Sequence, residues 1–436
     1  MTAEGTKMKI GFIHNRWPGA AGAGSTIEAN VLTRKLCERG HDITVFCHNT
    51  PPAEQIDDGF DIVDLAIPTN SRLANIRGRQ QFSTAINNLE HDFSQYDIVH
   101  SYVGSAIPGL AKATKDVDVP VAASLIGYGS LCPKKDLLYM NKRSCSENGM
   151  MRCTNCSVQT LFSRRSGYYD GTPVEQHSTL MWPLVWGYYL LNRLFNLSHV
   201  MDVKTQRSGI DRYHTTTSHM KKTYTAFGFP SQKIDVVPGM LDERFLIDHR
   251  SDFEEPFSLL YVGALRRKKG VAKLVPILDR LLDSGTDFSL TVVGDGPMRQ
   301  TLAEQVRENH LQRCVKSLGH LPFDEMPEVY ADHDIFVYPG ILDEPFGRVF
   351  IEALATGTPI VGSQVGAFER IVGDGGAVTD GSIAEFVETI LEIIDEGILE
   401  KMSKKGKDRA DRYKPGPVID QFEQFYQRTL SNDNLG

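Results

Sequence analysis

The stretch "DEPFGRVFIEALATGTPIV", residues 343–361, decides the fold, because it reads as a loop, a short helix and a buried strand. One apolar face recurs at helical spacing, at Val349, Phe350, Ala353 and Leu354. Gly357 follows where a helix end favours a left-handed residue, and Pro359 prevents the helix from continuing. Glu352 is therefore a carboxylate on a short helix that starts after Gly347.

The start of this helix, at Pro345-Phe346-Gly347, combines a phosphate-binding feature with two carboxylates. A helix N-terminus presents free backbone N–H groups, which favour an anion such as phosphate. Glu344 and Glu352 lie on either side of the turn, with seven residues between them. A glutamate is ordinarily solvated on the surface, so the motif alone leaves a solvated surface helix as the alternative.

Length and composition limit the class of protein. The chain has 436 residues, of which 41% are hydrophobic and 23% are charged, so two or three domains are expected. Its net charge of −8 gives no case for a nucleic-acid partner. The longest apolar run, 180–191, contains Pro183 and Gly187 and is too short to span a membrane. Seven cysteines without a signal-peptide pattern indicate a reducing cytoplasm.

Apolar runs of strand length alternate with helix-length segments in two arrays. The first array contains 9–15, 42–48, 97–102, 119–125, 214–218 and 234–239, and the second contains 257–263, 288–294, 315–321, 334–340 and 359–363. A charged linker, 241–256, separates them. The alternation predicts an α/β protein with two doubly wound parallel sheets, near 1–238 and 257–410, that bind ligands at the carboxyl ends of their strands.

Glycine-rich turns follow several of these strands. Gly22 and Gly24 precede a helix within 17–31, and Gly294 ends the strand of "VVGDGP". The dinucleotide fingerprint and the P-loop sequence are both absent from the sequence. The turn "YVGALRRKKG", 261–270, adds several cations within reach of a phosphate, although a solvated basic turn would look the same.

Taken together, these elements resemble family-four retaining glycosyltransferases. The pieces that occur in the order and spacing of that family are "GHDITVF", "YVGALRRKKG", "VVGDGPMRQTLAE", "LGHLPFDEMPEVYADHDIFVYPG", "EPFGRVFIEALATGTPIVGSQVG" and "FERIV". The resemblance is strong over 257–375, moderate over 9–48 and 97–135, and faint between 160 and 213. Its most specific element is the pair of glutamates in the fifth piece.

The resemblance implies a GT-B fold, in which two Rossmann-like domains face each other across a cleft. The acceptor would bind the N-terminal domain, 1–238, and the nucleotide sugar would bind the C-terminal domain, 257–410. The last segment, 411–436, would cross back to the N-terminal domain, which would explain a helix at 418–430 that has no strand partner.

The same resemblance implies roles for individual residues. Glu352 would accept hydrogen bonds from the ribose hydroxyls, and Glu344 would contact the donor sugar. The donor sugar and pyrophosphate would lie by the amides of Phe346, Gly347 and Arg348, where a helix N-terminus favours negative charge. Gly24 and Gly294 would belong to glycine-rich loops of the cofactor-binding site.

Departure of a nucleoside diphosphate builds negative charge, which fixed cations stabilise in the transition state. Lys269 matches the family lysine in this catalytic role. The arginine that the family places after Gly263 is Ala264 here, so we expect Arg266 or Arg267 to supply that charge.

A second departure concerns the family's active-site histidine, whose position is Ile126. Because the family is thought to retain configuration by same-face attack, no nucleophile is expected, and loss of the histidine need not end catalysis. His100 could compensate, or it could be a strand-end residue with a satisfied hydrogen bond.

Four cysteines lie close together in the sequence, namely Cys132, Cys145, Cys153 and Cys156. Four thiolates can close a tetrahedral zinc site, so structural zinc is one interpretation. Reduced or conditionally disulfide-bonded thiols are the other. A similar loop in some family members looks structural, and no catalytic metal is expected.

We therefore expect a cytoplasmic glycosyltransferase of hexosyltransferase type, which transfers a sugar from a nucleotide sugar with retention. The expected acceptor is a lipid-linked or cell-surface glycan precursor. The alternatives are a soluble small-molecule acceptor, or a catalytically weak glycan-binding subunit.

Two segments predict a peripheral position on the cytoplasmic face of a membrane. Residues 180–195 contain Trp182 and Trp186 among large aliphatic residues, as an interfacial helix does, although a buried helix is the alternative. The cysteine-containing loop 132–165 holds seven Lys or Arg against two Asp or Glu, a local charge of +5 that would attract anionic lipid.

Overall fold

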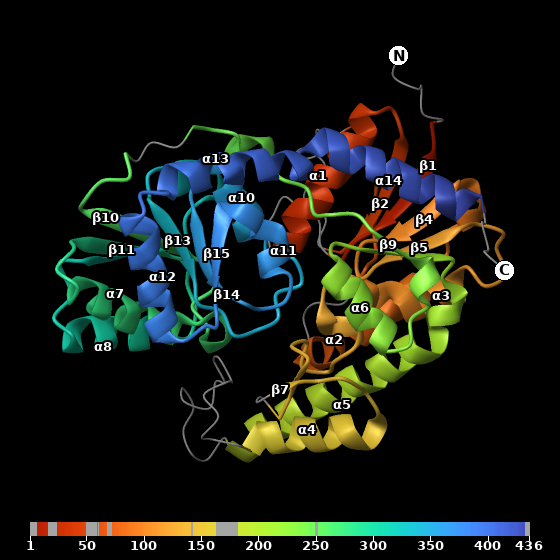
Figure 1. Ribbon diagram of the computed structural model, residues 1–436. Helices are drawn as coiled ribbons and strands as arrows, with labels where there is room; N and C mark the ends of the chain where they lie inside the picture. The colour runs from red at the N-terminus through yellow and green to blue at the C-terminus, as the bar shows by residue number, and fades with distance from the viewer. Residues whose placement is uncertain are drawn as a thin grey trace. The chain divides into compact units, whose positions relative to one another are not determined.

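The protein is described here by a computed structural model. It describes residues 7–15, 24–48, 59, 61–67, 72–140, 143–162, 182–248 and 252–431. The chain forms two compact units (Figure 1). The first contains the described residues up to Phe162, those from Trp182 to Met240, and those from Pro415 onward. The second contains the described residues of Leu241–Lys414.

The first unit is built on a seven-stranded parallel sheet in the order β3-β2-β1-β4-β5-β8-β9. Its strands are β1 (Lys9–Ile13), β2 (Asp42–Cys47), β3 (Asp61–Asp64), β4 (Ile98–Ser101), β5 (Val121–Ser124), β8 (Arg212–Thr215) and β9 (Ile234–Val236). A separate antiparallel hairpin pairs β6 (Leu138–Tyr139) with β7 (Arg143–Ser144). The central strands are buried on both faces, as their continuous apolar sequences require.

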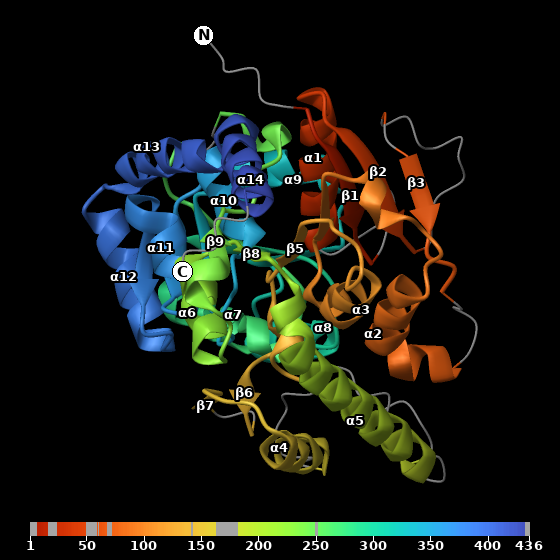
Figure 2. The same cartoon turned by 90° about the vertical axis from the view of Figure 1, so that its right-hand side faces the viewer.

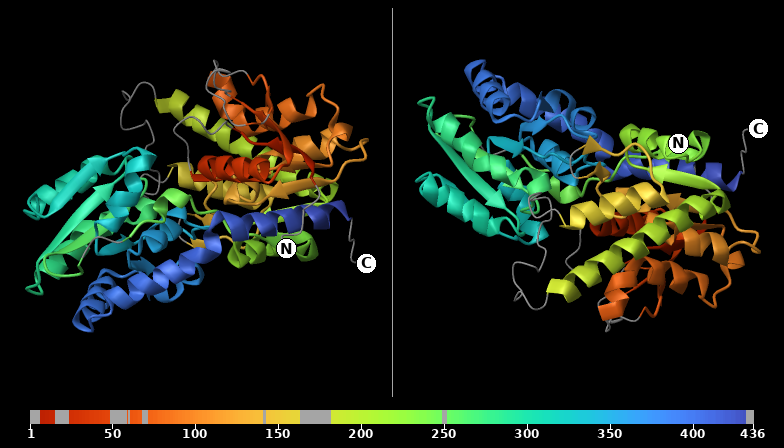
Figure 3. Two further views of the ribbon diagram at one scale, coloured as in Figure 1. Left: turned by 90° about the horizontal axis from the view of Figure 1, so that it is seen from above. Right: turned by 90° about the horizontal axis from the view of Figure 1, so that it is seen from below.

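Helices cover both faces of this sheet. They are α1 (Gly24–Glu38), α2 (Arg72–Asn87), α3 (Ile107–Ala113), α4 (Met150–Phe162), α5 (Trp182–Gln206), α6 (Ser218–Ala226) and α14 (Pro415–Leu430). On one face, α1 and α14 pack side by side and share a core with β1 and β2 (Figure 2). The core on the opposite face takes side chains from α2, α3, α5 and α6. Helix α4 runs beside α5 (Figure 3).

The second unit contains a six-stranded parallel sheet in the order β12-β11-β10-β13-β14-β15. Its strands are β10 (Phe257–Val262), β11 (Phe288–Val293), β12 (Val315–Gly319), β13 (Ile335–Tyr338), β14 (Ile360–Ser363) and β15 (Gly376–Thr379). Its helices are α7 (Leu274–Leu282), α8 (Arg299–Glu308), α9 (Met326–Ala331), α10 (Arg348–Thr356), α11 (Phe368–Val372), α12 (Ile383–Asp395) and α13 (Leu399–Ala410). The predicted α/β fold with two parallel sheets is confirmed.

A directed chain of buried hydrogen bonds fastens α14 to the first sheet. His214 Nε2 lies 2.9 Å from Val237 O, and a carbonyl only accepts, so Nε2 carries the proton. Burial lowers the pKa of His214 to about 4, so its Nδ1 is unprotonated and accepts from Ser124 Oγ at 2.8 Å. Ser124 Oγ in turn accepts from His100 Nε2 at 2.8 Å, and Tyr426 OH donates to His100 Nδ1 at 2.9 Å.

His100 is therefore a structural residue of the core. Its side chain is buried, and both ring nitrogens have partners within the first unit. Burial, reinforced by His214, also lowers the pKa of His100 well below its ordinary value, so the ring is neutral. Of the two interpretations that the sequence left open, the strand residue with satisfied hydrogen bonds is the one observed, and His100 does not replace the missing histidine.

We predict that Tyr426→Phe lowers the free energy of unfolding by about 1–3 kcal/mol, because it leaves the buried His100 Nδ1 without a donor. Urea denaturation measures the loss. Arg39→Gln is the matched control, since it removes the exposed ion pair of Arg39 with Asp420 on the same helix and should cost at most about 1 kcal/mol. Equal losses in the two variants would show that the network does not hold α14.

Candidate functional site

The candidate site lies at the carboxyl ends of β10, β11 and β13, where two glycines let the loops press together. Gly294 has φ +129°, and a Cβ there would lie 2.0 Å from Gly263 O. Gly270 has φ +79°, and a Cβ there would lie 1.9 Å from Pro339 O. Only glycine fits either position. At Gly294, the predicted cofactor loop after β11 packs closely against the backbone at the end of β10.

A lysine, a tyrosine and a carboxylate meet at this edge. Tyr338 OH donates to Glu344 Oε2 at 2.8 Å, and Lys269 Nζ forms an ion pair with the same oxygen. Lys269 Nζ also lies 3.4 Å from Tyr338 OH. Burial, followed by the nearby Glu344 charge, raises the pKa of Tyr338 well above its ordinary value, so the phenol remains a donor. Two predicted catalytic residues, Lys269 and Glu344, are thus in direct contact, and the hydroxyl group of Tyr338 lies against both.

The turn before α10 is shaped by Gly347. Its φ is +76°, and a Cβ there would lie 2.3 Å from the ring of Phe350. Phe346 is buried and packs edge-on against Tyr413 at 5.8 Å between ring centroids, which fixes the turn from behind. The N-terminus of α10 therefore has a fixed direction, with the first-turn N–H groups beginning at Arg348.

Glu352 is buried within α10, unlike an ordinary surface glutamate. Its Oε1 accepts from Arg348 Nε at 3.4 Å, and its Oε2 accepts from Tyr330 OH at 3.2 Å. Burial raises the pKa of Glu352, while Arg348 and the Tyr330 hydrogen bond act in the opposite direction. Each carboxylate oxygen keeps a further lone pair, so Glu352 can still accept from a ligand. The solvated alternative is not observed.

The other cations of the basic turn are exposed. Arg266 precedes the short 3-10 helix η11 (Arg267–Lys269), and both Arg266 and Arg267 have exposed side chains. Ala264, where the family arginine is expected, is exposed as well. The turn therefore carries two exposed guanidinium groups near Lys269.

The remaining predicted residues belong to the first unit. Gly24 is the first residue of α1, whereas Gly22 lies outside the described residues. Ile126 is half-buried just beyond the carboxyl end of β5. Gly24 belongs to the first unit, whereas Gly294 belongs to the second.

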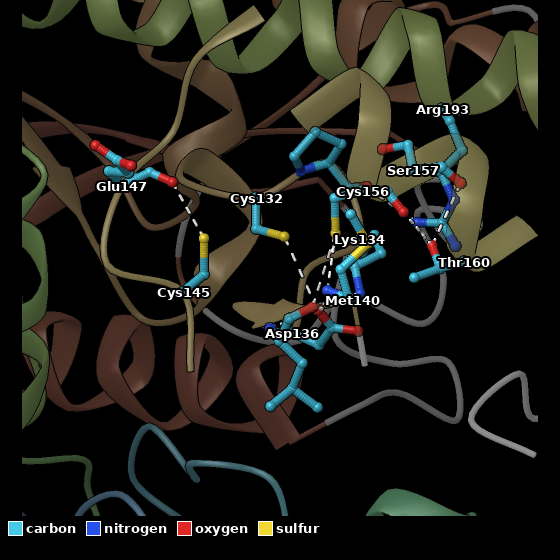
Figure 4. Close-up of polar contacts among 12 residues, drawn as sticks. Cys132, Lys134, Asp136, Met140, Cys145, Glu147, Cys156, Ser157, Thr160 and Arg193 are labelled. Carbon is cyan, nitrogen blue, oxygen red and sulfur yellow. Dashed lines mark hydrogen bonds and ion pairs between the residues drawn. The ribbon is translucent and has the colours of Figure 1, made fainter. Parts of the chain in front are cut away.

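The predicted zinc site at the four cysteines is not supported by the structure. Cys132, Cys145, Cys153 and Cys156 line one small cavity, but the described residues include no group of three or more metal-ligating side chains placed to hold an ion. Cys145 Sγ donates to Glu147 O at 3.1 Å, and Cys156 Sγ accepts from the Met140 amide at 3.2 Å (Figure 4). The seven cysteines, all of which lie in the described residues, form no disulfide.

The surroundings of this cluster raise the pKa of two of its thiols. Burial raises the pKa of Cys132 to about 11, with Asp136 acting in the same direction. Burial also raises the pKa of Cys153. These surroundings favour neutral thiols, and Cys145 and Cys156 take part in the hydrogen bonds of the loop.

Sequence reasoning missed two tyrosines of the site. Tyr338 and Tyr330 are buried, so they read as strand and helix core, yet their hydroxyl groups hold Glu344 and Glu352. Their hydroxyl groups could have indicated a polar role, because the hydroxyl of a buried tyrosine usually forms a hydrogen bond.

Comparison with solved structures defines the fold. Sucrose-phosphate synthase from Thermosynechococcus elongatus superimposes with a TM-score of 0.69 at 17% identity, covering 98% of this chain and 100% of that one. The Anabaena HepE protein in complex with UDP-glucose gives a TM-score of 0.63 at 16% identity, covering 97% and 99%. At these identities the likeness shows the fold alone. The predicted GT-B fold is confirmed.

Comparison of the sequence finds a family match within the second unit. Residues 243–409 match the family model described as "Glycosyl transferases group 1". The 2-deoxystreptamine glucosyltransferase of Streptomyces kanamyceticus is 27% identical over 227 residues, which span 48% of this chain and 58% of that relative. Residues 243–409 thus match a group 1 glycosyltransferase domain, which agrees with the resemblance predicted from the motifs.

We predict that Glu352→Gln weakens binding of the nucleotide-sugar donor by roughly ten- to hundredfold, because a hydrogen bond to a charged group contributes about 1.5–3 kcal/mol. Isothermal titration measures the dissociation constant.

The pH dependence of binding provides the control. Since burial raises the pKa of Glu352, wild-type affinity should fall as the pH drops through that raised pKa, whereas the glutamine variant should not follow this curve. An unchanged dissociation constant in Glu352→Gln would exclude the ribose assignment.

Proposed function

We propose that the protein is a retaining glycosyltransferase, which transfers a sugar from a nucleoside diphosphate sugar to an acceptor. The observation that carries the proposal is the pair of held carboxylates, Glu344 and Glu352, on either side of the α10 N-terminus. One would contact the sugar and the other the ribose, with the pyrophosphate between them at the helix N-terminus.

The contacts within the site support a mechanism based on charge. Without donor, Lys269 pairs with Glu344. A bound pyrophosphate would compete for Lys269, and the released Glu344 oxygen could then accept from a sugar hydroxyl. As the nucleoside diphosphate departs, its growing charge is stabilised by Lys269, by the amides of Phe346, Gly347 and Arg348, and by the exposed Arg266 or Arg267.

We predict that Lys269→Ala lowers kcat more than it raises KM, because the charge opposite the lysine grows in the transition state. Steady-state kinetics with the accepted donor measure both constants. Arg266→Ala and Arg267→Ala are the comparison, and the guanidinium that replaces the missing family arginine should give the larger loss of kcat. A Lys269→Ala enzyme with unchanged kcat would remove the lysine from the mechanism.

The function itself is tested with a panel of nucleotide sugars, scored both for stabilisation of the protein against heat and for hydrolysis or transfer. Turnover of at least one donor is the expected result. Binding without turnover would favour the weak glycan-binding subunit. Ile126 and Ala264 are consistent with that alternative, because they replace the histidine and the arginine of the family. Transfer to soluble sugars alone would favour the small-molecule acceptor.

We further propose that the acceptor is a lipid-linked or surface-glycan precursor, met at the cytoplasmic face of a membrane. The support comes from α4 and α5, which lie side by side and leave Met150, Met151, Leu191 and Leu194 exposed. Tyr188 and Tyr189, half-buried on α5, supply the amphipathic rings of an interfacial helix. No helix of the described segments is long and apolar enough to cross a membrane.

We predict salt-sensitive binding to anionic liposomes, measured by cosedimentation, that is reduced by the double variant Leu191→Asp/Leu194→Asp. Each basic residue near an anionic surface contributes about 1 kcal/mol, so added salt should release the protein. The Trp182 and Trp186 side chains, with Arg164 and Arg165, belong to the same prediction and lie outside the described residues.

Leu246→Asp is the matched control, because Leu246 is an exposed leucine of the second unit. A protein that stays in the supernatant with anionic vesicles at low salt would refute the membrane proposal.

A further inference from the structure

Helix α2 directs a guanidinium, that of Arg79, onto the loop that follows β5. Arg79 Nη1 donates to Gly129 O at 2.7 Å, and Gly129 belongs to the short 3-10 helix η4 (Tyr128–Ser130). Nη2 lies 3.4 Å from the place that a Cβ of Gly129 would occupy, so the guanidinium rests against the glycine. Nη2 is buried and has no hydrogen-bond partner among the described residues.

A second buried nitrogen without a partner lies in the same region. His199 on α5 is 1% exposed, and its Nε2 has no hydrogen-bond partner among the described residues. Burial, followed by the positive charges of Arg79 and Lys135, lowers the pKa of His199 to about 3, so the ring is neutral. Buried polar groups are normally paired, and leaving one unpaired costs about 1–3 kcal/mol. Two such groups together indicate a missing acceptor.

The charges around Arg79 point to an anion. Burial lowers the pKa of Arg79 to about 10, and the neighbouring cation of Arg193 acts in the same direction. Arg193 Nη1 donates to Pro133 O at 3.4 Å, and Lys135 is exposed on the same loop. Within the described part of the chain, no carboxylate forms a hydrogen bond or ion pair with Arg79.

The nearest acidic residue of the loop is already paired. Asp136 lies 3.6 Å from Lys134 and receives the Leu138 amide at 3.0 Å. The region places the positive charges of Arg79, Lys135 and Arg193 beside a neutral histidine. Holding cations close together is unfavourable, and an anion bound among them offsets the repulsion.

We propose that Arg79 and His199, with Lys135 and Arg193, form a subsite for a phosphoryl group carried by the acceptor substrate. A phosphoryl group offers several acceptor oxygens and up to two negative charges, and a guanidinium fork matches its geometry. The subsite follows the carboxyl end of β5, where ligands bind in open parallel sheets. Its role in catalysis rests on the proposed function, whereas anion binding does not.

The test is a titration of the full chain with inorganic phosphate, followed by ³¹P NMR at constant ionic strength. Because the donor site could also take phosphate, the titration is made in the Lys269→Ala background. One saturable phosphate site is expected to remain there. Arg79→Gln should weaken it at least tenfold, and Arg79→Lys should keep part of the affinity because the charge is retained.

Lys135→Ala tests the same subsite without touching the core, since Lys135 is exposed. It should weaken phosphate binding several-fold and leave the unfolding midpoint unchanged. Arg39→Gln, on the opposite face of the sheet, is the charge-matched control and should have no effect on phosphate. These variants keep the test valid if Arg79→Gln fails to fold.

Loss of saturable phosphate binding in the Lys269→Ala protein would overturn the proposal. So would a phosphate affinity in the Arg79→Gln and Lys135→Ala variants that equals that of the Lys269→Ala background. The outcome is separable from the proposed function. Phosphate binding that depends on Arg79 in the Lys269→Ala background would support the subsite, whereas turnover of a nucleotide sugar by the wild-type protein tests the proposed function separately.

Discussion

The burial of the Glu352 carboxylate constrains the second unit more than any other single feature. Removing an ionised carboxylate from water costs several kcal/mol unless it is paired and hydrogen-bonded. Arg348 comes from the same helix, but Tyr330 comes from α9, so both helices must be placed correctly before the charge is compensated. The arrangement fixes the start of α10 and therefore the direction of its free N–H groups.

The same logic governs Glu344, although its partners come from elsewhere. Lys269 lies in the turn after β10, and Tyr338 is the last residue of β13. Because β10 and β13 are paired neighbours in a parallel sheet, their carboxyl ends meet at one edge. Gly270 has no side chain, so the loop after β10 can approach the backbone of Pro339 in the loop after β13. The chemistry of the candidate site thus follows from strand order and from one left-handed glycine.

The first unit holds its buried polar groups in two different ways. In the first sheet, Tyr426, His100, Ser124 and His214 satisfy one another completely, so this buried network is rigid and chemically silent. Near the carboxyl end of β5, by contrast, Arg79 Nη2 and His199 Nε2 are buried without partners among the described residues. The fully hydrogen-bonded network contributes to stability, whereas the buried nitrogens without partners indicate a site for a ligand.

The sequence by itself determined the two parallel sheets, the family and the position of both glutamates, because these depend on local periodicity and on the order of motifs. The helix expected around Val349 to Leu354 is α10, whereas the edge strands β3 and β15 escaped because they are short and flanked by polar residues. The tertiary structure alone decided that the phenol groups of Tyr330 and Tyr338 hold the carboxylates, that His100 is buried in the core, and that the four clustered cysteines line one small cavity. Each of these depends on which distant residues share a buried space, and burial changes both the partners and the pKa of a group in ways that spacing along the chain does not encode.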